Sequence, residues 1–448
     1  MTNSPLQIFA TSFHSSNRLT RLQQSGLAER AKTHHEIFLD PDKSFQEIEG
    51  FGGAFTESAA VTFAEMPAAL QDQVLSAYFD SKVGHGYTLC RTHLNSCDFS
   101  LGNYACCDTP NDEELSTFSL NRERKALLPL MQAAQKSAGG KIKLLISPWS
   151  PPAWMKTTGR MNQGGSLRPE CAHLWARHYL RFAQELEKEG MSTWGVTVQN
   201  EPAATQPWDS CLYTAEQERD FVRDHLGPVL HQAGRSDIRI LVWDHNREFI
   251  YSRVKPVYDD PEAAKYVWGA GFHWYCGDHF ESLQSVHDAY PDKKLLFTEG
   301  CQEGGAHAGS WATGERYARS MINDLNHWTT GWIDWNILLN EAGGPNHVGN
   351  YCSAPILYDR TLQRINFQSS YYYIGHFARF IRPGARRIVA ASSLDELETT
   401  AALNPDGSIA AVVLNRTEQA HPFHLRFADR DVMVESPARS ILTLVWGG

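Results

Sequence analysis

The most constraining feature of the sequence is a regular alternation of short β-type runs with longer helical patterns between about residues 45 and 336. Each run is rich in apolar residues, and the stretches between the runs carry apolar positions at helical spacing. Repeated βα units are typical of a parallel sheet, and eight of them predict an α/β chain that closes into a (β/α)8 TIM barrel. The expected strands are Phe45–Gly50, Tyr87–His93, Lys143–Ser147, Gly195–Gln199, Ile238–Trp243, Trp268–His273, Lys294–Thr298 and Gly331–Trp335.

The pattern changes after Arg379, where short alternating runs separated by turn residues replace the helical stretches. We expect these runs to form a small β-sandwich. The segment before the barrel, about Leu6–Leu39, carries strand-like pieces, and we expect it to pair with the C-terminal sheet because an isolated pair of strands is not stable. The predicted organisation is therefore N-terminal strands that join the sandwich (1–44), the barrel (45–380) and the C-terminal β-sandwich (381–448).

Composition narrows the class of protein. The 448 residues are 42% hydrophobic, which is enough for a large core, and the net charge of −10 is spread without a Lys/Arg block. This distribution argues against nucleic acid or an anionic membrane surface as the main partner. Nine cysteines without a Cys-x-x-Cys pair favour reduced thiols, and we expect neither a metal nor a cofactor.

The N-terminal residues lack the basic and apolar regions of a classical secretory signal. The chain also offers no run of about 18 uncharged apolar residues, so no transmembrane segment is expected. We therefore expect a cytoplasmic protein or one exported by a route that needs no signal peptide.

Polar residues directly follow most of the expected strands, and two of them are glutamates. Glu201 ends the stretch Val198-Gln-Asn-Glu, and Glu299 follows the seventh strand. Because reactive groups of a (β/α)8 barrel lie at the carboxyl ends of its strands, these glutamates can face each other across the barrel mouth. Two such carboxyls are what retaining glycoside hydrolysis requires, one as acid/base and one as nucleophile.

The surrounding residues suit a sugar, since aromatic faces pack against sugar C–H groups and short polar side chains bind hydroxyls. Simpler readings apply to each residue alone: Asn200-Glu201-Pro202 is also typical of a turn with an exposed glutamate. His273 is more typical of a supporting hydrogen bond than of a general base. Arg91 is compatible with a core ion pair or a solvated side chain, and Cys301 with a small buried residue or a reactive thiol. The aromatic candidates are Trp149, Trp154, Trp208, Trp274, Tyr275 and Trp335, and the polar ones are Asp98 and Asn200.

Longer motifs resemble the glucosylceramidase (acid β-glucosidase) type of glycoside hydrolase family 30. The similarity runs from about Gly50 to the C-terminal segment and is greatest to bacterial members, including glucosylceramidase-like effectors delivered by type III secretion. The motifs that carry it are Gly50-Phe-Gly-Gly-Ala-Phe-Thr-Glu57, Ser96-Cys-Asp-Phe99, Ser147-Pro-Trp-Ser-Pro-Pro-Ala-Trp154, Val198-Gln-Asn-Glu-Pro202, His273-Trp-Tyr275 and Gly331-Trp-Ile-Asp-Trp-Asn-Ile-Leu-Leu-Asn-Glu-Ala-Gly-Gly-Pro-Asn346.

The resemblance implies a role for each matching residue. Glu201 resembles the family's acid/base, and Glu299 resembles its nucleophile. Tyr275 resembles the tyrosine that bonds the nucleophile, with Asp244 and His273 as its neighbours. The remaining positions implied to hold the terminal glucose or close its pocket are Asp98, Trp149, Asn200, Trp335 and Asn350.

The leaving-group side is less defined. The loop Ala203–Ser210 is shorter than in lysosomal relatives and carries Trp208, so the aglycone stays open. We expect a retaining β-glucosidase acting on a β-glucoside, with a glycolipid at a membrane surface as one candidate substrate. The alternatives are a β-1,6-glucanase or β-xylosidase on the same scaffold, or a catalytically silent carbohydrate-binding or host-interacting protein. The retaining mechanism needs a proton on Glu201 in the free enzyme, so we expect its pKa to be raised.

Overall fold

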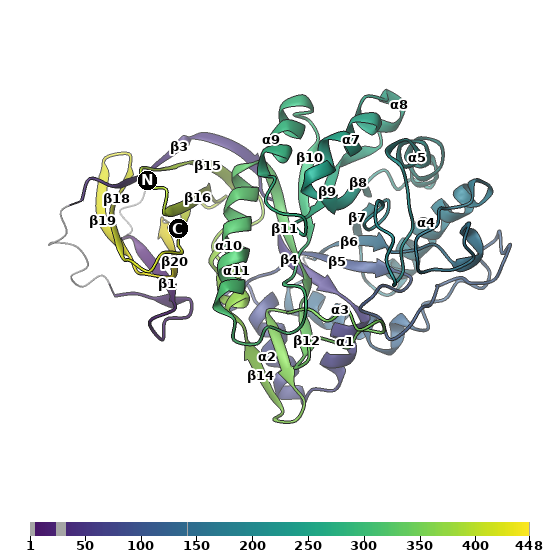
Figure 1. Ribbon diagram of the computed structural model, residues 1–448, viewed down its shortest axis with the longest axis horizontal. Coiled ribbons are helices and arrows are strands. Elements are labelled where there is room, and N and C mark those ends of the chain that lie inside the picture. The colour runs from purple at the N-terminus through teal and green to yellow at the C-terminus, as the bar shows by residue number, and fades with distance from the viewer. Residues whose placement is uncertain (1–4, 24–32, 141, 448) are drawn as a thin grey trace.

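The computed structural model describes residues 5–23, 33–140 and 142–447, which form a barrel and a smaller β-domain side by side (Figure 1). The predicted (β/α)8 barrel is confirmed, because eight parallel strands close on one another with hydrogen bonds from each strand to the next. Nearly every residue of these strands is buried, as expected for a parallel sheet covered by helices. The strands are β4 (Gly50–Phe55), β5 (Leu89–Leu94), β6 (Lys143–Pro148), β7 (Thr193–Thr197), β8 (Arg239–Asn246), β9 (Val267–His273), β10 (Lys294–Glu299) and β11 (Thr329–Asn336).

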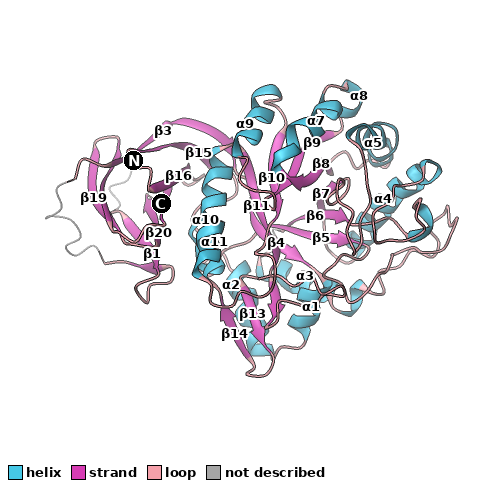
Figure 2. Ribbon diagram, viewed as in Figure 1, coloured by secondary structure: helices cyan, strands magenta, loops and turns pink. Residues whose placement is uncertain are grey.

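Helices follow the strands and surround the barrel (Figure 2). Local sequence sets several of their ends: Pro67 separates α1 from α2, and Thr214 and Gln217 form a reciprocal capping box at the start of α5. The helices are α1 (Glu57–Ala64), α2 (Ala68–Phe79), α3 (Leu127–Ser137), α4 (Ala172–Lys188), α5 (Ala215–Phe221), α6 (Gly227–Gln232), α7 (Ile250–Tyr258), α8 (Pro261–Ala264), α9 (Phe280–Ala289), α10 (Trp311–Asn326) and α11 (Ser369–Ala378).

The prediction for the first barrel strand is wrong. Most of Phe45–Gly50 belongs to, or directly follows, β3 (Glu36–Glu47), which pairs with strands of the smaller domain, whereas the barrel strand begins at Gly50. The true strand contains Gly52-Gly53, a pair that β-propensity disfavours. A Cβ atom at Gly52 would lie 1.6 Å from the Leu89 carbonyl oxygen, so close packing against β5 requires glycine there.

The smaller domain is one nine-stranded sheet in the order β19-β18-β3-β15-β16-β17-β20-β1-β2. The sheet folds back so that β19 contacts β17 and β20, and the two layers enclose a separate apolar core. As predicted, strands before the barrel join it: β1 pairs with β20, and β3 lies between β15 and β18. The strands besides β3 are β1 (Gln7–Ser12), β2 (Thr20–Arg21), β15 (Arg386–Ser392), β16 (Leu397–Leu403), β17 (Ile409–Asn415), β18 (His421–Phe427), β19 (Arg430–Ser436) and β20 (Ser440–Trp446).

Parts of the expected N-terminal segment, residues 1–4 and 24–32, lie outside the described residues. The β-domain packs on α10 and α11, on the side of the barrel away from the direction in which β5, β6 and β7 point (Figure 1). A short sheet of β12 (Leu338–Asn340), β13 (Ile356–Asp359) and β14 (Arg364–Phe367) follows β11. Within the described ranges, no helix is long and apolar enough to cross a membrane.

Candidate active site

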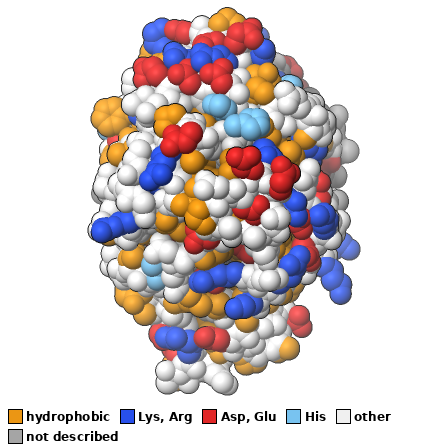
Figure 3. Space-filling view, turned by 90° about the vertical axis from the view of Figure 1, so that its right-hand side faces the viewer, with side chains coloured by type: hydrophobic (Ala, Val, Ile, Leu, Met, Phe, Trp, Pro, Cys, Tyr) orange, Lys and Arg blue, Asp and Glu red, His pale blue; other side chains and the backbone are white. Residues whose placement is uncertain are grey.

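A pocket of about 220 Å³ lies at the carboxyl ends of the barrel strands. Figure 3 views the molecule from that side, and acidic side chains gather near the middle of the face. The pocket combines carboxylates, amides, one imidazole, two thiols and aromatic rings. Its lining residues are Asp98, Phe99, Trp149, Asn200, Glu201, Gln206, Trp208, His245, Asn246, Tyr275, Glu299, Cys301, Glu303, Trp335, Asn350 and Cys352.

Glu201 and Glu299 face each other across this pocket, as predicted from their strand positions. Glu299 is the last residue of β10, and Glu201 follows β7 by four residues in a left-handed conformation with φ of 49°. One carboxylate oxygen of each glutamate and one ring nitrogen of His273 lie within 4.8 Å of one another. That separation matches retaining glycosidases and is too short for the intervening water of inverting ones, which needs about 6.5–9.5 Å.

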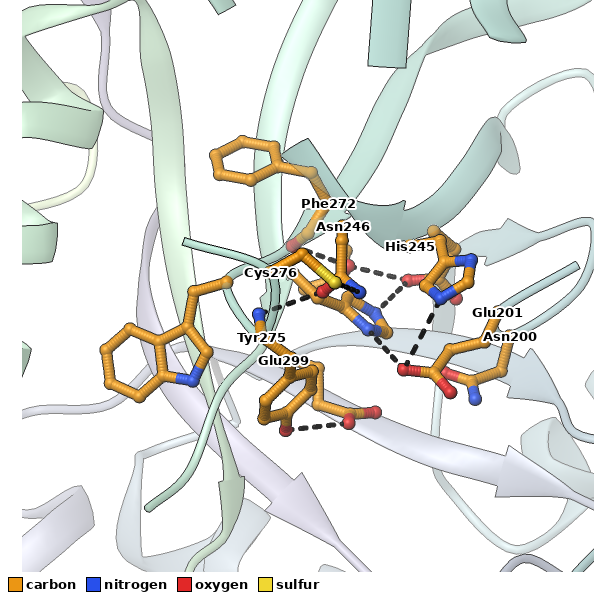
Figure 4. A network of polar contacts seen from close by, with 12 residues as sticks. Asn200, Glu201, His245, Asn246, Phe272, Tyr275, Cys276 and Glu299 are labelled. Atoms are coloured by element: carbon orange, nitrogen blue, oxygen red, sulfur yellow. Dashed lines mark hydrogen bonds and ion pairs between the residues drawn. The ribbon is translucent and has the colours of Figure 1, made fainter. Parts of the chain in front are cut away.

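Glu299 accepts hydrogen bonds from two side chains that keep their protons near neutral pH. Its Oε2 accepts a hydrogen bond from Arg91 Nη1 at 2.6 Å. Its Oε1 accepts one from the Tyr275 hydroxyl at 3.0 Å (Figure 4). Burial raises the pKa of Glu299, and the charges of His273 and Arg91 oppose that rise. Both oxygens are thus fixed in direction, which is the requirement for an attacking carboxylate.

Glu201 is held by groups that are neutral or able to exchange a proton. His273 Nδ1 lies 3.3 Å from Oε1. His245 Nε2 lies 4.0 Å from the same oxygen (Figure 4). The other oxygen, Oε2, accepts a hydrogen bond from Gln206 Nε2 at 3.4 Å. Two imidazoles therefore flank one oxygen of the carboxylate, and an amide contacts the other.

Asp244 determines which nitrogen of His273 carries a proton. Asp244 is fully buried and accepts hydrogen bonds from Arg91 and from the hydroxyls of Thr197 and Thr298. Despite its burial, these donors and His273 keep its pKa low, so it is ionised and His273 Nε2, at 3.1 Å, must donate to it. The contact between His273 Nδ1 and Glu201 then needs one proton, held by either the imidazole or the carboxyl.

The location of that proton corrects the expectation for Glu201. Burial alone would raise the pKa of Glu201, but the hydrogen bond from His273 and the charges of both histidines lower it to about 2. Burial lowers the pKa of His273, but Glu299, Asp244 and Glu201 outweigh it and raise it to about 9. The free protein therefore holds the proton on His273, one hydrogen bond away from Glu201.

Arg91 links the carboxylates of Glu299 and Asp244 to the aromatic wall of the pocket. It is fully buried and donates to Glu299, Asp244 and Asn200, which settles its predicted alternatives in favour of a core ion pair. Its guanidinium lies over the rings of Trp149 and Trp335, at 4.7 and 5.6 Å from their centroids. The two indoles stack 5.1 Å apart and form an aromatic wall of the pocket.

The structure brings together the residues expected to contact a sugar. All of the residues predicted to contact substrate line the pocket: Asp98, Trp149, Asn200, Tyr275, Trp335, Asn350 and Trp208. Among them, Asn350 Nδ2 donates a hydrogen bond to Asp98 Oδ2 at 3.1 Å. His273 and Arg91 contact the glutamates without lining the pocket, and Asp244 contacts both His273 and Arg91. Cys301 lines the pocket itself. Trp154 and Trp274, expected among the aromatic residues, do not line it, and Trp274 packs against Phe297 and Tyr317 instead.

Sequence reasoning missed several lining residues. His245 and Asn246 directly follow Asp244, so their place at a strand end was a usable signal. Gln206, Glu303 and Cys352 lie in loops. Their positions depend on how those loops fold over the barrel mouth, and no residue pattern in the sequence predicts the conformation of these loops.

The cluster of Glu201, His273 and Glu299 has the spacing of a metal site, but its surroundings do not suit a cation. The Arg91 guanidinium contacts Glu299, and both nitrogens of His273 already contact carboxylates. A metal ion would have to displace these partners and lie close to a buried positive charge.

Comparison with known proteins places these features in a family. The model of the glycosyl hydrolase family 30 TIM-barrel domain matches residues 48–381, and that of the family 30 beta sandwich domain matches residues 384–444. Lysosomal acid glucosylceramidase of Mus musculus is 37% identical over 94% of this chain and 85% of its own length. An endo-1,6-beta-D-glucanase of Neurospora crassa is 27% identical over 84% of this chain and 80% of its own length.

Solved structures agree with this placement. SrfJ from Salmonella typhimurium superposes with a TM-score of 0.94 at 39% identity, covering 98% of this chain and 99% of its own. The endo-beta1,6-glucanase BT3312 superposes with a TM-score of 0.89 at 29% identity, covering 98% of each chain. These matches confirm the resemblance drawn from the motifs: the chain belongs to glycosyl hydrolase family 30, among relatives that include glucosylceramidases, and is a glycoside hydrolase.

Proposed function

We propose that this chain is a retaining β-glucosidase of the glucosylceramidase type, which hydrolyses terminal β-D-glucosides by double displacement. The observation that carries the proposal is the pair of carboxylates, with oxygens of Glu201 and Glu299 within 4.8 Å of each other in one pocket. Asp98 and Asn350, which the family resemblance assigns to holding the terminal glucose and closing its pocket, are joined by a hydrogen bond in the lining of the same pocket.

In the first step Glu299 attacks the anomeric carbon through an oxocarbenium-like transition state, while Glu201 protonates the departing oxygen. The proton that Glu201 delivers comes from His273 across their 3.3 Å contact. In the second step Glu201 accepts a proton from water, which attacks the glucosyl ester on Glu299. Arg91 and Tyr275 keep the oxygens of Glu299 in place for both steps.

The stereochemistry of the product tests the mechanism. Hydrolysis of an aryl β-glucoside is followed by NMR, and we expect β-glucose as the first product. If α-glucose were released first, the reaction would be inverting and the assignment of Glu299 as nucleophile would be wrong. An absence of any hydrolysis would favour the silent carbohydrate-binding alternative.

A β-1,6-glucanase is the second candidate, because BT3312, an endo-beta1,6-glucanase by its title, shares the fold over 98% of both chains. A panel of aryl β-glucoside, aryl β-xyloside, glucosylceramide in mixed micelles and a β-1,6-glucan separates the candidates. Preference for glucosylceramide supports a glycolipid at a membrane surface as substrate. Preference for the glucan, with oligosaccharide products, supports the second candidate.

A further inference from the structure

Two free thiols lie in the pocket wall on the side of Glu299. Cys301 follows β10, two residues after Glu299, and Cys352 lies in the segment between β12 and β13. Both line the pocket, with exposed fractions of 5% and 3%. The double-displacement steps use neither of them.

Main-chain pairing brings the two thiols together. The segment after β10 and the segment before β13 run antiparallel, with a bridge between Glu303 and Cys352 and a 2.9 Å hydrogen bond from the Ser353 N–H to the Gln302 carbonyl. The Cys301 and Cys352 side chains then lie next to each other, in one buried cluster that also contains Trp149 and Trp335. Their proximity is therefore set by backbone on both sides.

The two thiols have different surroundings. Cys301 Sγ lies 3.5 Å from the Tyr275 hydroxyl, whose proton goes to Glu299, so the Cys301 thiol can donate to the Tyr275 oxygen. The Cys352 thiol instead donates to the Ser353 carbonyl at 3.3 Å. The contact with Cys352 lowers the pKa of Cys301, but burial together with the charges of Glu299 and Glu303 raises it. Burial raises the pKa of Cys352 well above its usual range.

We propose that Cys301 and Cys352 form a dithiol site for thiophilic ligands, of the class of trivalent arsenicals and soft metal ions. Sulfur ligands select such partners. After the first sulfur binds, the second bond forms within the molecule, so the pair holds a ligand more tightly than one thiol does.

The reaction with an aryl arsenical that carries two hydroxyls on arsenic needs no oxidant. Each thiol gives its proton to one hydroxyl, two As–S bonds form, two As–O bonds break, and two waters leave. The bound ligand would lie beside Tyr275, which contacts Cys301 and donates to Glu299. It would therefore occupy part of the pocket and block the sugar.

The test uses phenylarsine oxide on the full chain, with intact-mass spectrometry and aryl β-glucoside hydrolysis as separate readouts. We expect the wild-type protein to gain one phenylarsenic group and to lose hydrolysis, with both changes reversed by a small dithiol. Cys301→Ser and Cys352→Val should each lack the stable adduct and keep the rate that they show without reagent.

Cys276→Ser is the matched control, because Cys276 is an exposed thiol that does not line the pocket. This variant should bind the reagent and lose hydrolysis as the wild-type protein does. A wild-type protein without adduct, or an adduct that persists in both Cys301→Ser and Cys352→Val, would overturn the proposal. Cys352→Ala repeats the test if thermal unfolding shows that the valine variant is misfolded.

The mass readout does not depend on turnover. A chain that hydrolyses no glucoside would contradict the proposed function, yet the adduct would still form or fail to form. The two proposals therefore fail separately.

Discussion

The two carboxylates face each other across one pocket, yet their partners differ in kind. Glu299 is bound by an arginine and a phenol, whereas Glu201 is bound by an imidazole and an amide. Arginine does not release its proton in proteins, so it fixes a charge, while histidine exchanges a proton near neutral pH. The partners of Glu299 therefore stabilise a negative charge. On the other side of the pocket, Glu201 and His273 can exchange a proton.

The largest expected effect comes from replacing the carboxylate of Glu299 with a neutral amide. Glu299→Gln should reduce the turnover of every glucoside by on the order of 10⁴-fold or more, because no covalent intermediate can form. The measurement is kcat for an activated aryl β-glucoside, in protein whose circular dichroism matches the wild type. Activity close to that of the wild type would show that Glu299 is not the nucleophile.

Removing the proton carrier should have an effect that depends on the leaving group. Glu201→Gln should slow poor leaving groups by roughly 10²–10⁴-fold, since they need protonation, while good leaving groups still form the glucosyl intermediate. A pre-steady-state burst with an activated aryl glucoside measures this difference. Equal loss for both classes of substrate would contradict the acid/base role.

Stability should be most sensitive on the Glu299 side. Arg91→Met leaves Glu299 and Asp244 buried without their cation, and we expect a loss of about 3–5 kcal/mol in the free energy of unfolding. Arg122→Met is the control, because Arg122 binds Glu57 with its side chain still 32% exposed and should cost about 1 kcal/mol or less. Chemical unfolding of both variants measures the difference. If both variants lost the same free energy of unfolding, the buried ion pairs of Arg91 would contribute no more to stability than the partly exposed pair of Arg122.

The pH dependence of stability should depend on His273. Its pKa is raised from 6.5 to about 9 in the folded protein, so its contribution is fully present below 6.5 and is lost as pH rises through about 9. His273→Gln should flatten the decline in unfolding free energy over that window. If the slope of unfolding free energy against pH were unchanged in this variant, a group other than His273 would be responsible for the decline.

The smallest expected effect concerns the amide beside Glu201. Gln206 donates a long, 3.4 Å hydrogen bond, so Gln206→Ala should lower kcat/KM by about two- to fivefold for a poor leaving group. Gln302→Ala is the control, because Gln302 binds Arg316 and does not line the pocket. A larger loss in the Gln206 variant would mean that this residue also contacts the aglycone.

The barrel could be predicted because seven of its strands form apolar runs with polar residues after them. β4 could not be predicted from its sequence. Close contact with β5 requires glycine at Gly52, and glycine has a low propensity for β-strands. The pattern does not predict β19, because its charged residues, such as Asp431 and Glu435, interrupt the apolar alternation. The short sheet β12–β14 was missed as well, since it follows β11 without a clear turn signal.

For the site, the sequence predicted Glu201, Glu299 and most of the residues that line the pocket. It gave the wrong direction for the pKa of Glu201, because a mechanism states which group must deliver a proton and not where the proton rests. That location depends on His273, which is held by Asp244 on one side and faces Glu201 on the other. Gln206, Glu303 and Cys352 entered the pocket only through loop packing.

The sequence by itself determined the barrel, the attached β-domain and the pair of glutamates, because periodicity and motifs are local properties of a chain. Only the tertiary structure decided which groups contact each carboxylate, where the shared proton lies, and that Cys301 and Cys352 meet in one wall. The physical reason is that electrostatic interactions in a buried site depend on distance and burial, and both are set by residues far apart in the chain.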